Sequence, residues 1–169
     1  MTRDRLAEAI RLREEGRAKQ DQVILQEART LLLELAAAYP DDAEILFQTG
    51  VAHDNSGLGA QAVPYYIRAL ELGLSGPDLE RCLLGLGSTC RYLGNYQQAE
   101  EVLRRGVKEF PHNRAIQVLY AMVLYNTERY KEAMEIVLTN LLETTNDEKL
   151  QYFKRGLLYY STHLDERSS

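Results

Sequence analysis

Small residues recur along this chain at a nearly constant interval, and this recurrence constrains the fold more than any other feature. One series, with spacings of 34, 37 and 34 residues, consists of Gly16, Gly50, Gly87 and Ala121. A second series, twelve residues later each time, consists of Ala28, Ala62, Ala99 and Ala133. Glycine inside a helix costs about 1 kcal/mol relative to alanine, so its return at one phase indicates a packing role. Repetition at this interval indicates stacked helix pairs.

A large apolar side chain follows each alanine of the second series after four residues, namely Leu32, Tyr66, Leu103 and Val137. Where two helices approach closely, one supplies a residue of almost no volume and the other fills the space beside it. No stretch longer than a few residues alternates apolar and polar side chains as a half-buried strand would. The sequence therefore predicts an all-α chain in which each unit is a pair of helices.

Composition excludes several classes of partner. The 169 residues include 20 Lys and Arg and 25 Asp and Glu, which gives a net charge of −5, and the basic residues are scattered. Without a basic surface, nucleic acid is not an expected partner. The longest apolar runs are broken by Glu34 and fall far short of the ~20 residues that span a bilayer, so we expect no membrane association. No apolar stretch follows the first charged residues, so we expect a cytoplasmic protein.

The repeated positions resemble the tetratricopeptide repeat, a 34-residue helix-turn-helix with small residues at the helix crossing and proline at the end. The clearest copy is the third unit, with Leu83, Leu86-Gly87, Leu93-Gly94-Asn95-Tyr96, Ala99, Leu103, Gly106 and Pro111. The resemblance covers about residues 9–144 and is greatest to short, stand-alone bacterial members without a catalytic domain. It implies a right-handed superhelix of about four helix pairs with a C-terminal capping helix, and a protein-interaction scaffold.

The resemblance also predicts the organisation of the chain. We expect a single domain over residues 1–165, with repeats at about 9–42, 43–76, 80–113 and 114–147, a capping helix at 147–164 and a tail at 166–169. Asp41 with Glu44 is expected to cap the second unit, and the stretch Thr145-Asn146-Asp147 to cap the last helix. Pro64 is expected in the first turn of its helix. The first unit lacks a recognisable turn signal.

One face of each first helix is expected to line a concave, apolar groove that binds a partner. Its predicted residues are Phe47, Val51, Asn55, Arg81, Leu84, Arg91, Tyr92, Val118, Met122, Tyr125 and Asn126, with Asp54 and Ser88 on the same face. Exposed contiguous apolar area is usually covered by a partner, and a peptide or an amphipathic helix would fit such a groove. The alternative is that a short array closes on itself.

The last helix is apolar on more than one face, which exceeds what one-sided packing uses. Phe153, Leu157 and Tyr160 are therefore candidates for self-association, and a homodimeric scaffold is the alternative function. A weaker alternative is the basic clamp by which some tetratricopeptide domains hold the C-terminal carboxylate of chaperones. The matching positions keep three charges but lack the clamp's asparagines; they are Arg13, Arg17, Gln48, Arg81 and Gly85.

We predict no catalytic residue, metal ligand or cofactor. The three histidines have no spacing that makes metal ligands converge, and His53 falls on the packing face as a core or edge residue. Cys82 and Cys90 lie about two helical turns apart, too far to form a disulfide, and are interpreted as small buried side chains. An enzymatic function would require a cluster that only tertiary proximity can reveal.

Overall fold

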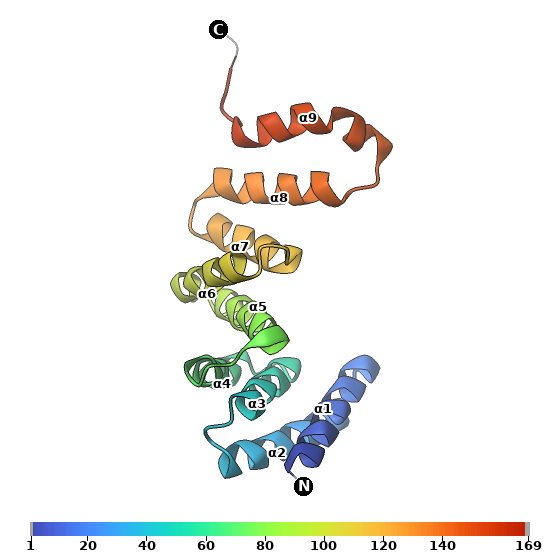
Figure 1. Cartoon of the computed structure of the whole chain (residues 1–169), viewed down its shortest axis with the longest axis vertical. Helices are drawn as coiled ribbons and strands as arrows, with labels where there is room; N and C mark the ends of the chain where they lie inside the picture. Colours follow the sequence, from blue (N-terminus) through green and yellow to red (C-terminus); the bar gives the residue numbers. More distant parts are fainter. Residues whose placement is uncertain (1, 168–169) are drawn as a thin grey trace. The chain divides into compact units, whose positions relative to one another are not determined.

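The computed structural model describes residues 2–167, which form nine helices and no strand (Figure 1). The helices are α1 (Thr2–Lys19), α2 (Gln22–Ala38), α3 (Ala43–Asn55), α4 (Gly59–Glu71), α5 (Gly76–Tyr92), α6 (Tyr96–Glu109), α7 (Arg114–Asn126), α8 (Tyr130–Thr144) and α9 (Glu148–Thr162). The prediction of an all-α chain of helix pairs is confirmed. Of the predicted tail at 166–169, Ser168 and Ser169 lie outside the described residues.

The helices group into two compact units. The first contains α1 to α5 and ends at Asn95, and the second begins at Tyr96 and contains α6 to α9. The division falls at the turn between α5 and α6, which are the two helices of the predicted third repeat. Each unit has its own buried apolar residues.

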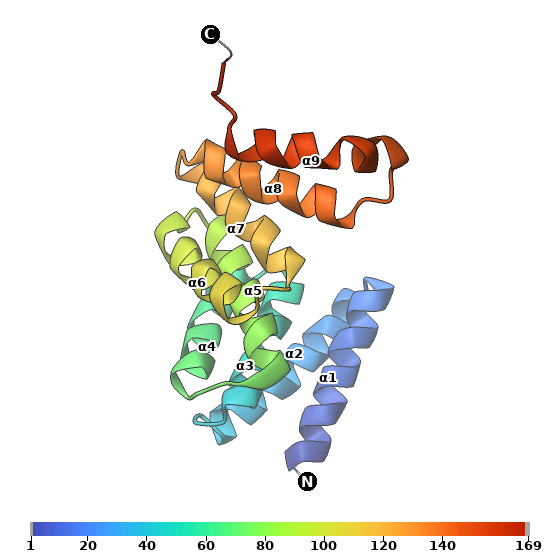
Figure 2. The same cartoon turned by 45° about the horizontal axis from the view of Figure 1, so that its top comes forward.

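The first unit is built around α3. Helices that follow one another in sequence pack side by side, and α3 also contacts α1 and α5. Figure 2 shows α1 and α2 as an antiparallel pair. Because α3 packs against four helices, residues 45–50 are all buried, although a helix at the surface would bury only one stripe.

Glycine permits the closest approaches between these helices. A Cβ atom built on Gly16 would lie 2.9 Å from the backbone nitrogen of Leu25, and one built on Gly50 would lie 2.8 Å from the ring of Tyr66. Both distances are shorter than van der Waals contact, so a larger residue would push the helices apart. The packing role predicted from the recurrence is confirmed at these two positions.

Aspartate side chains cap α2, α3 and α9, with one difference from prediction. Asp42, and not Asp41, caps α3 by accepting hydrogen bonds from the backbone N–H groups of Glu44 and Ile45, both at 3.1 Å. Asp41 instead forms an ion pair with Arg68 at 2.9 Å. The cap of α9 is Asp147, which lies in the predicted stretch of residues 145–147. Two adjacent aspartates offered two possible caps, and only the backbone conformation distinguished them.

Two further positions depart from expectation. The first repeat does contain a tight turn, because Gln20 adopts a left-handed conformation with φ of 54° and Asp21 caps α2. Pro64 lies inside α4, beyond the first turn that begins at Gly59, so the prediction for Pro64 was wrong. The helix begins earlier than expected because Gly57, with φ of 73°, reverses the chain just before it.

In the second unit, α6 to α9 pack in sequence order. Between α7 and α8, a cluster of buried residues consists of Ala121, Leu124 and Ala133. The buried amide of Asn140 joins the same two helices by donating to Gln117 Oε1 at 2.8 Å. This unit therefore combines an apolar contact with a polar one.

The last helix is the least buried. Figure 1 shows α9 running back along α8, and within the described residues α9 contacts α8 but not α7. In the first unit, by contrast, α3 contacts α1 and α5 contacts α3. Only Ser161 of α9 is fully buried, and Val137 of α8 is exposed although its counterparts Leu32, Tyr66 and Leu103 are buried.

Candidate partner-binding surfaces

The predicted groove residues of the first unit differ widely in exposure. Tyr92 is 87% exposed at the end of α5, whereas Phe47 is only 1% exposed. The Phe47 ring lies 6.2 Å from the Tyr66 ring and is covered by the guanidinium of Arg81, 5.4 Å from the ring centre. Phe47 therefore belongs to the core beneath this face. The half-buried members of the predicted set are Val51, Asn55, Leu84 and Arg91.

A pocket of about 420 Å³ opens between the α3–α4 turn and α5. It is lined by Asp54, Gly57, Gly59, Leu84, Gly85, Ser88, Thr89 and Tyr92. The structure thus brings together Leu84, Tyr92, Asp54 and Ser88, which the sequence placed on one face. Thr89 and the glycines were missed. Gly59 shapes the wall, because a Cβ atom there would lie 3.0 Å from Thr89 Cγ2.

Asp54 places a carboxylate in this pocket. Tyr66 donates a hydrogen bond to Oδ2 at 2.7 Å, and Thr89 Oγ1 donates to the same oxygen at 2.8 Å. Burial raises the pKa of Asp54, although both hydrogen bonds act to lower it. Burial, together with the nearby Asp54, also raises the pKa of Cys90 to about 11. These bonds tie α3, α4 and α5 together at the pocket wall.

The basic residues of this unit do not form an open clamp. Arg13 is 2% exposed and donates a hydrogen bond to Gln48 Oε1 at 2.5 Å. Burial, reinforced by the positive charge of Arg81, lowers the pKa of Arg13. A guanidinium held inside the unit cannot receive a ligand carboxylate at the surface. The clamp alternative therefore loses one of its three charges.

In the second unit, the predicted groove residues lie on α7. Met122 and Tyr125 are exposed, while Val118 and Asn126 are half-buried. The Tyr125 ring meets the ring of Tyr130 edge to face, with ring centres 5.2 Å apart. Sequence analysis missed an exposed stripe along α8 that consists of Tyr130, Met134, Val137 and Leu141. Their i, i+4, i+7, i+11 spacing was the available signal.

The predicted self-association residues lie on α9. Phe153 and Tyr160 are exposed, whereas Leu157 is half-buried. Tyr152 and Tyr159, which sequence analysis did not select for this role, are exposed as well. The exposed part of α9 is therefore richer in aromatic rings than expected.

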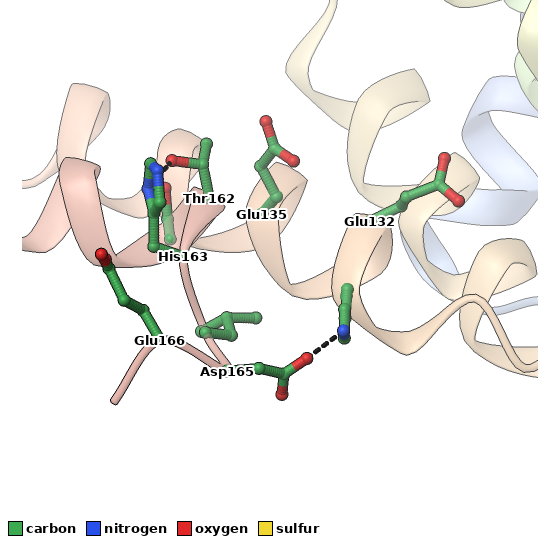
Figure 3. Close-up of a pocket in the computed structure, with 9 residues that line it drawn as sticks. Glu132, Glu135, Thr162, His163, Asp165 and Glu166 are labelled. Carbon is green, nitrogen blue, oxygen red and sulfur yellow. Dashed lines mark hydrogen bonds and ion pairs between the residues drawn. The ribbon is translucent and has the colours of Figure 1, made fainter. Parts of the chain in front are cut away.

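A second pocket, of about 260 Å³, lies between the start of α8 and the end of α9 (Figure 3). Its charged and polar groups form local pairs: Lys131 with Asp165, and Thr162 Oγ1 with His163 Nδ1 at 2.7 Å. Among residues 2–167, no three His, Cys, Asp or Glu side chains come together so that they could hold a metal ion.

His53, Cys82 and Cys90, whose side chains could take part in a reaction, are all buried. His53 Nδ1 lies 2.8 Å from the carbonyl oxygen of Thr49, and its ring stacks on Tyr65 at 5.1 Å. Cys82 and Cys90 are buried, as predicted. Their surroundings are those of packing residues and not of nucleophiles. Across the described chain, no helix has both the length and the apolar character needed to cross a membrane.

Comparison with known families agrees with this architecture. Residues 43–164, from α3 to just beyond α9, match the family described as Tetratrico peptide repeat. The chain belongs to this family. The resemblance noted in the sequence is thereby confirmed. No curated protein matches the sequence.

Solved structures share the fold at low sequence identity. MamA 41-end from Desulfovibrio magneticus RS-1 is similar with a TM-score of 0.70 and 18% identity, covering 95% of this chain and 90% of that one. A MamA RS-1 ArsTM double mutant is similar with a TM-score of 0.62 and 18% identity, and the match covers 93% of this chain and 96% of that one. A chain of the APC/C hetero-tetramer Cut9–Hcn1 is similar with a TM-score of 0.69 and 18% identity, and the match covers 92% of this chain and 29% of that chain.

These comparisons define the general class of the protein. Tetratricopeptide folds are typical of protein-interaction modules, and members of the family are generally non-catalytic scaffolds. At 18% identity the solved structures show the fold alone. The side chains on the surfaces described above must supply any specificity.

Proposed function

We propose that this tetratricopeptide-repeat protein is a non-enzymatic interaction module that binds a partner helix or peptide at its Tyr92 face. We define this face as Asp54, Leu84, Ser88 and Tyr92, which line one pocket. The observation that supports the proposal is the nearly complete exposure of the Tyr92 ring beside that pocket.

The chemistry of the Tyr92 face suits a partner segment with mixed apolar and polar side chains. Tyrosine is enriched among the residues that dominate binding energy, because it combines a large apolar ring with a hydrogen-bonding hydroxyl. Leu84 adds apolar area, and the Asp54 carboxylate and Ser88 hydroxyl can orient a bound group. An amphipathic helix with apolar residues one turn apart would satisfy both kinds of contact. Met122 and Tyr125 support the same function in the second unit.

Affinity purification from the native organism, followed by a binding measurement with the captured partner, tests this proposal. We expect Tyr92→Ala to weaken binding about 10- to 30-fold, the usual loss for an aromatic anchor residue. Tyr39→Ala is the matched control, because Tyr39 is also exposed in the first unit but does not line the pocket. Circular dichroism checks that both variants stay folded. Equal affinity of Tyr92→Ala and the unmodified protein would contradict the proposal.

A second candidate function is self-association as a homodimeric scaffold. It is supported by the exposed rings of α9, which α8 leaves uncovered. Light scattering coupled to size exclusion distinguishes the two candidates. A mass of 19.3 kDa at all concentrations indicates a monomeric module, and twice that mass indicates a dimer.

A further inference from the structure

The series of small crossing residues continues into α9. Gly156 follows Ala121 by 35 residues, which falls within the range of the earlier intervals of 34, 37 and 34 residues. Gly16 is covered by Leu25 and Gly50 by Tyr66, but a Cβ atom built on Gly156 would meet nothing within 4 Å. Thus α9 carries the crossing glycine of the first helix of a repeat, and no second helix within the described residues packs against it.

Aromatic residues are arranged symmetrically about this glycine. Tyr152 and Phe153 precede Gly156 by four and three residues, and Tyr159 and Tyr160 follow it by three and four. Residues three and four apart share one face of a helix. The four rings are 83%, 62%, 49% and 62% exposed. They form two edge-to-face pairs, with ring centres 4.9 Å and 5.7 Å apart.

We propose that this α9 ring face, consisting of Tyr152, Phe153, Gly156, Tyr159 and Tyr160, binds the same face of a second copy of this chain. The two α9 helices lie antiparallel, with both Gly156 residues at the crossing. The proposal rests on the second candidate function above and specifies its interface. In a two-fold interface each patch must match itself. The order of rings satisfies this, because the pair before Gly156 meets the pair after Gly156 in the other copy.

Charge favours the antiparallel arrangement. The charged side chains of α9 all precede Gly156, and they are one acidic residue, Glu148, and three basic residues, Lys149, Lys154 and Arg155. Residues 157–162, which complete the helix, carry no charge. A parallel pair would place the two net-positive halves side by side, which is unfavourable. An antiparallel pair places each net-positive half beside the uncharged half of the other copy.

The exposed area is sufficient for a specific contact. Aromatic side chains bury roughly 150–250 Å² each, so four rings that are 49–83% exposed offer on the order of 500 Å² per copy. Two copies would together bury about 1,000 Å², which reaches the lower bound for a biological interface. Glycine at the crossing lets the helix axes approach closely enough for the rings to meet.

A leucine at the crossing tests this interface. For Gly156→Leu, the open space at Gly156 and the better helix propensity of leucine leave the single copy folded, with an unchanged or higher melting temperature. In the dimer the same leucine lies between the two helices. We therefore expect the unmodified protein to elute at twice 19.3 kDa and Gly156→Leu at 19.3 kDa. Gln97→Leu, which adds an exposed leucine on α6, serves as the control and remains dimeric.

Cysteine cross-linking tests the orientation. Lys149 and His163 lie seven residues either side of Gly156, so an antiparallel pair brings residue 149 of one copy opposite residue 163 of the other. We expect the Lys149→Cys/His163→Cys double variant to form an intermolecular disulfide on oxidation. The single variant Lys149→Cys should form none, because its two copies lie about 21 Å apart at 1.5 Å per residue. The native Cys82 and Cys90 are buried.

Three results would overturn the proposal. They are a monomeric unmodified protein up to millimolar concentration, a dimer that survives Gly156→Leu, and a cross-link formed by Lys149→Cys alone. The Tyr92 binding measurement does not depend on any of them, so the two proposals can fail separately.

Discussion

At the scale of single residues, glycine at one repeat position has opposite consequences in different helices. Gly50 faces the Tyr66 ring, and Tyr66 cannot move aside because its hydroxyl is bonded to Asp54 at 2.7 Å. Gly156 faces open space. Substitution by alanine therefore tests side-chain packing at Gly50 and helix propensity at Gly156.

We predict that Gly50→Ala lowers the free energy of unfolding by up to about 2 kcal/mol. Overpacking costs roughly 1–3 kcal/mol, and the gain in helix propensity of about 1 kcal/mol offsets part of it. Gly156→Ala, measured by urea unfolding at low protein concentration, should instead gain up to about 1 kcal/mol. Equal effects at the two glycines would show that Tyr66 is not the constraint.

At the scale of a helix, α4 contains an interior proline that we expect to lower its stability. Pro64 lies inside the helix, where proline cannot donate a hydrogen bond to the carbonyl oxygen of Ala60 and its ring crowds that carbonyl. The side chain of Pro64 is exposed, so no core contact would be lost on its replacement.

We predict that Pro64→Ala raises the free energy of unfolding by about 1–2 kcal/mol. Proline costs about 3 kcal/mol in a helix interior, and part of the gain is offset by the greater freedom of the unfolded chain. The melting temperature in a thermal scan provides the measurement, and Ala60→Ser, which keeps Pro64, controls for surface changes on α4. A loss of stability would mean that the backbone geometry imposed by Pro64 helps to position Tyr66.

At the scale of the whole molecule, burial is unevenly distributed among the helices. α3 packs against four helices of the first unit, while α9 packs against α8 alone. In stacked helix arrays, stability follows from the contacts that each element makes with its neighbours. The local free energy of opening should therefore differ strongly between these two helices.

We predict that hydrogen exchange in the monomeric Gly156→Leu variant is slowest in α3 and fastest in α9. Amide exchange followed by mass spectrometry resolves the two segments. In the unmodified protein, protection of α9 should rise with concentration as the second copy covers it, while protection of α3 should not change. Protection of α9 equal to that of α3 in the variant would contradict the observed burial.

Periodicity in the chain was enough to predict the helices, the pairs α1–α2, α3–α4 and α7–α8, and the close crossings at Gly16 and Gly50. It also predicted the buried character of His53 and the two cysteines. These features depend on spacing along a helix, because residues three or four apart share a face whatever the rest of the fold does.

Which residues are exposed on the candidate binding surfaces depended on contacts between residues far apart in the chain. Phe47 is buried because Arg81 and Tyr66 cover it, and Asp54 lies in a pocket wall because Thr89 reaches it from another helix. The rings of α9 remain exposed because α9 packs against a single helix. Helical spacing determines which residues share a face, but only the packing of other helices determines whether that face is covered.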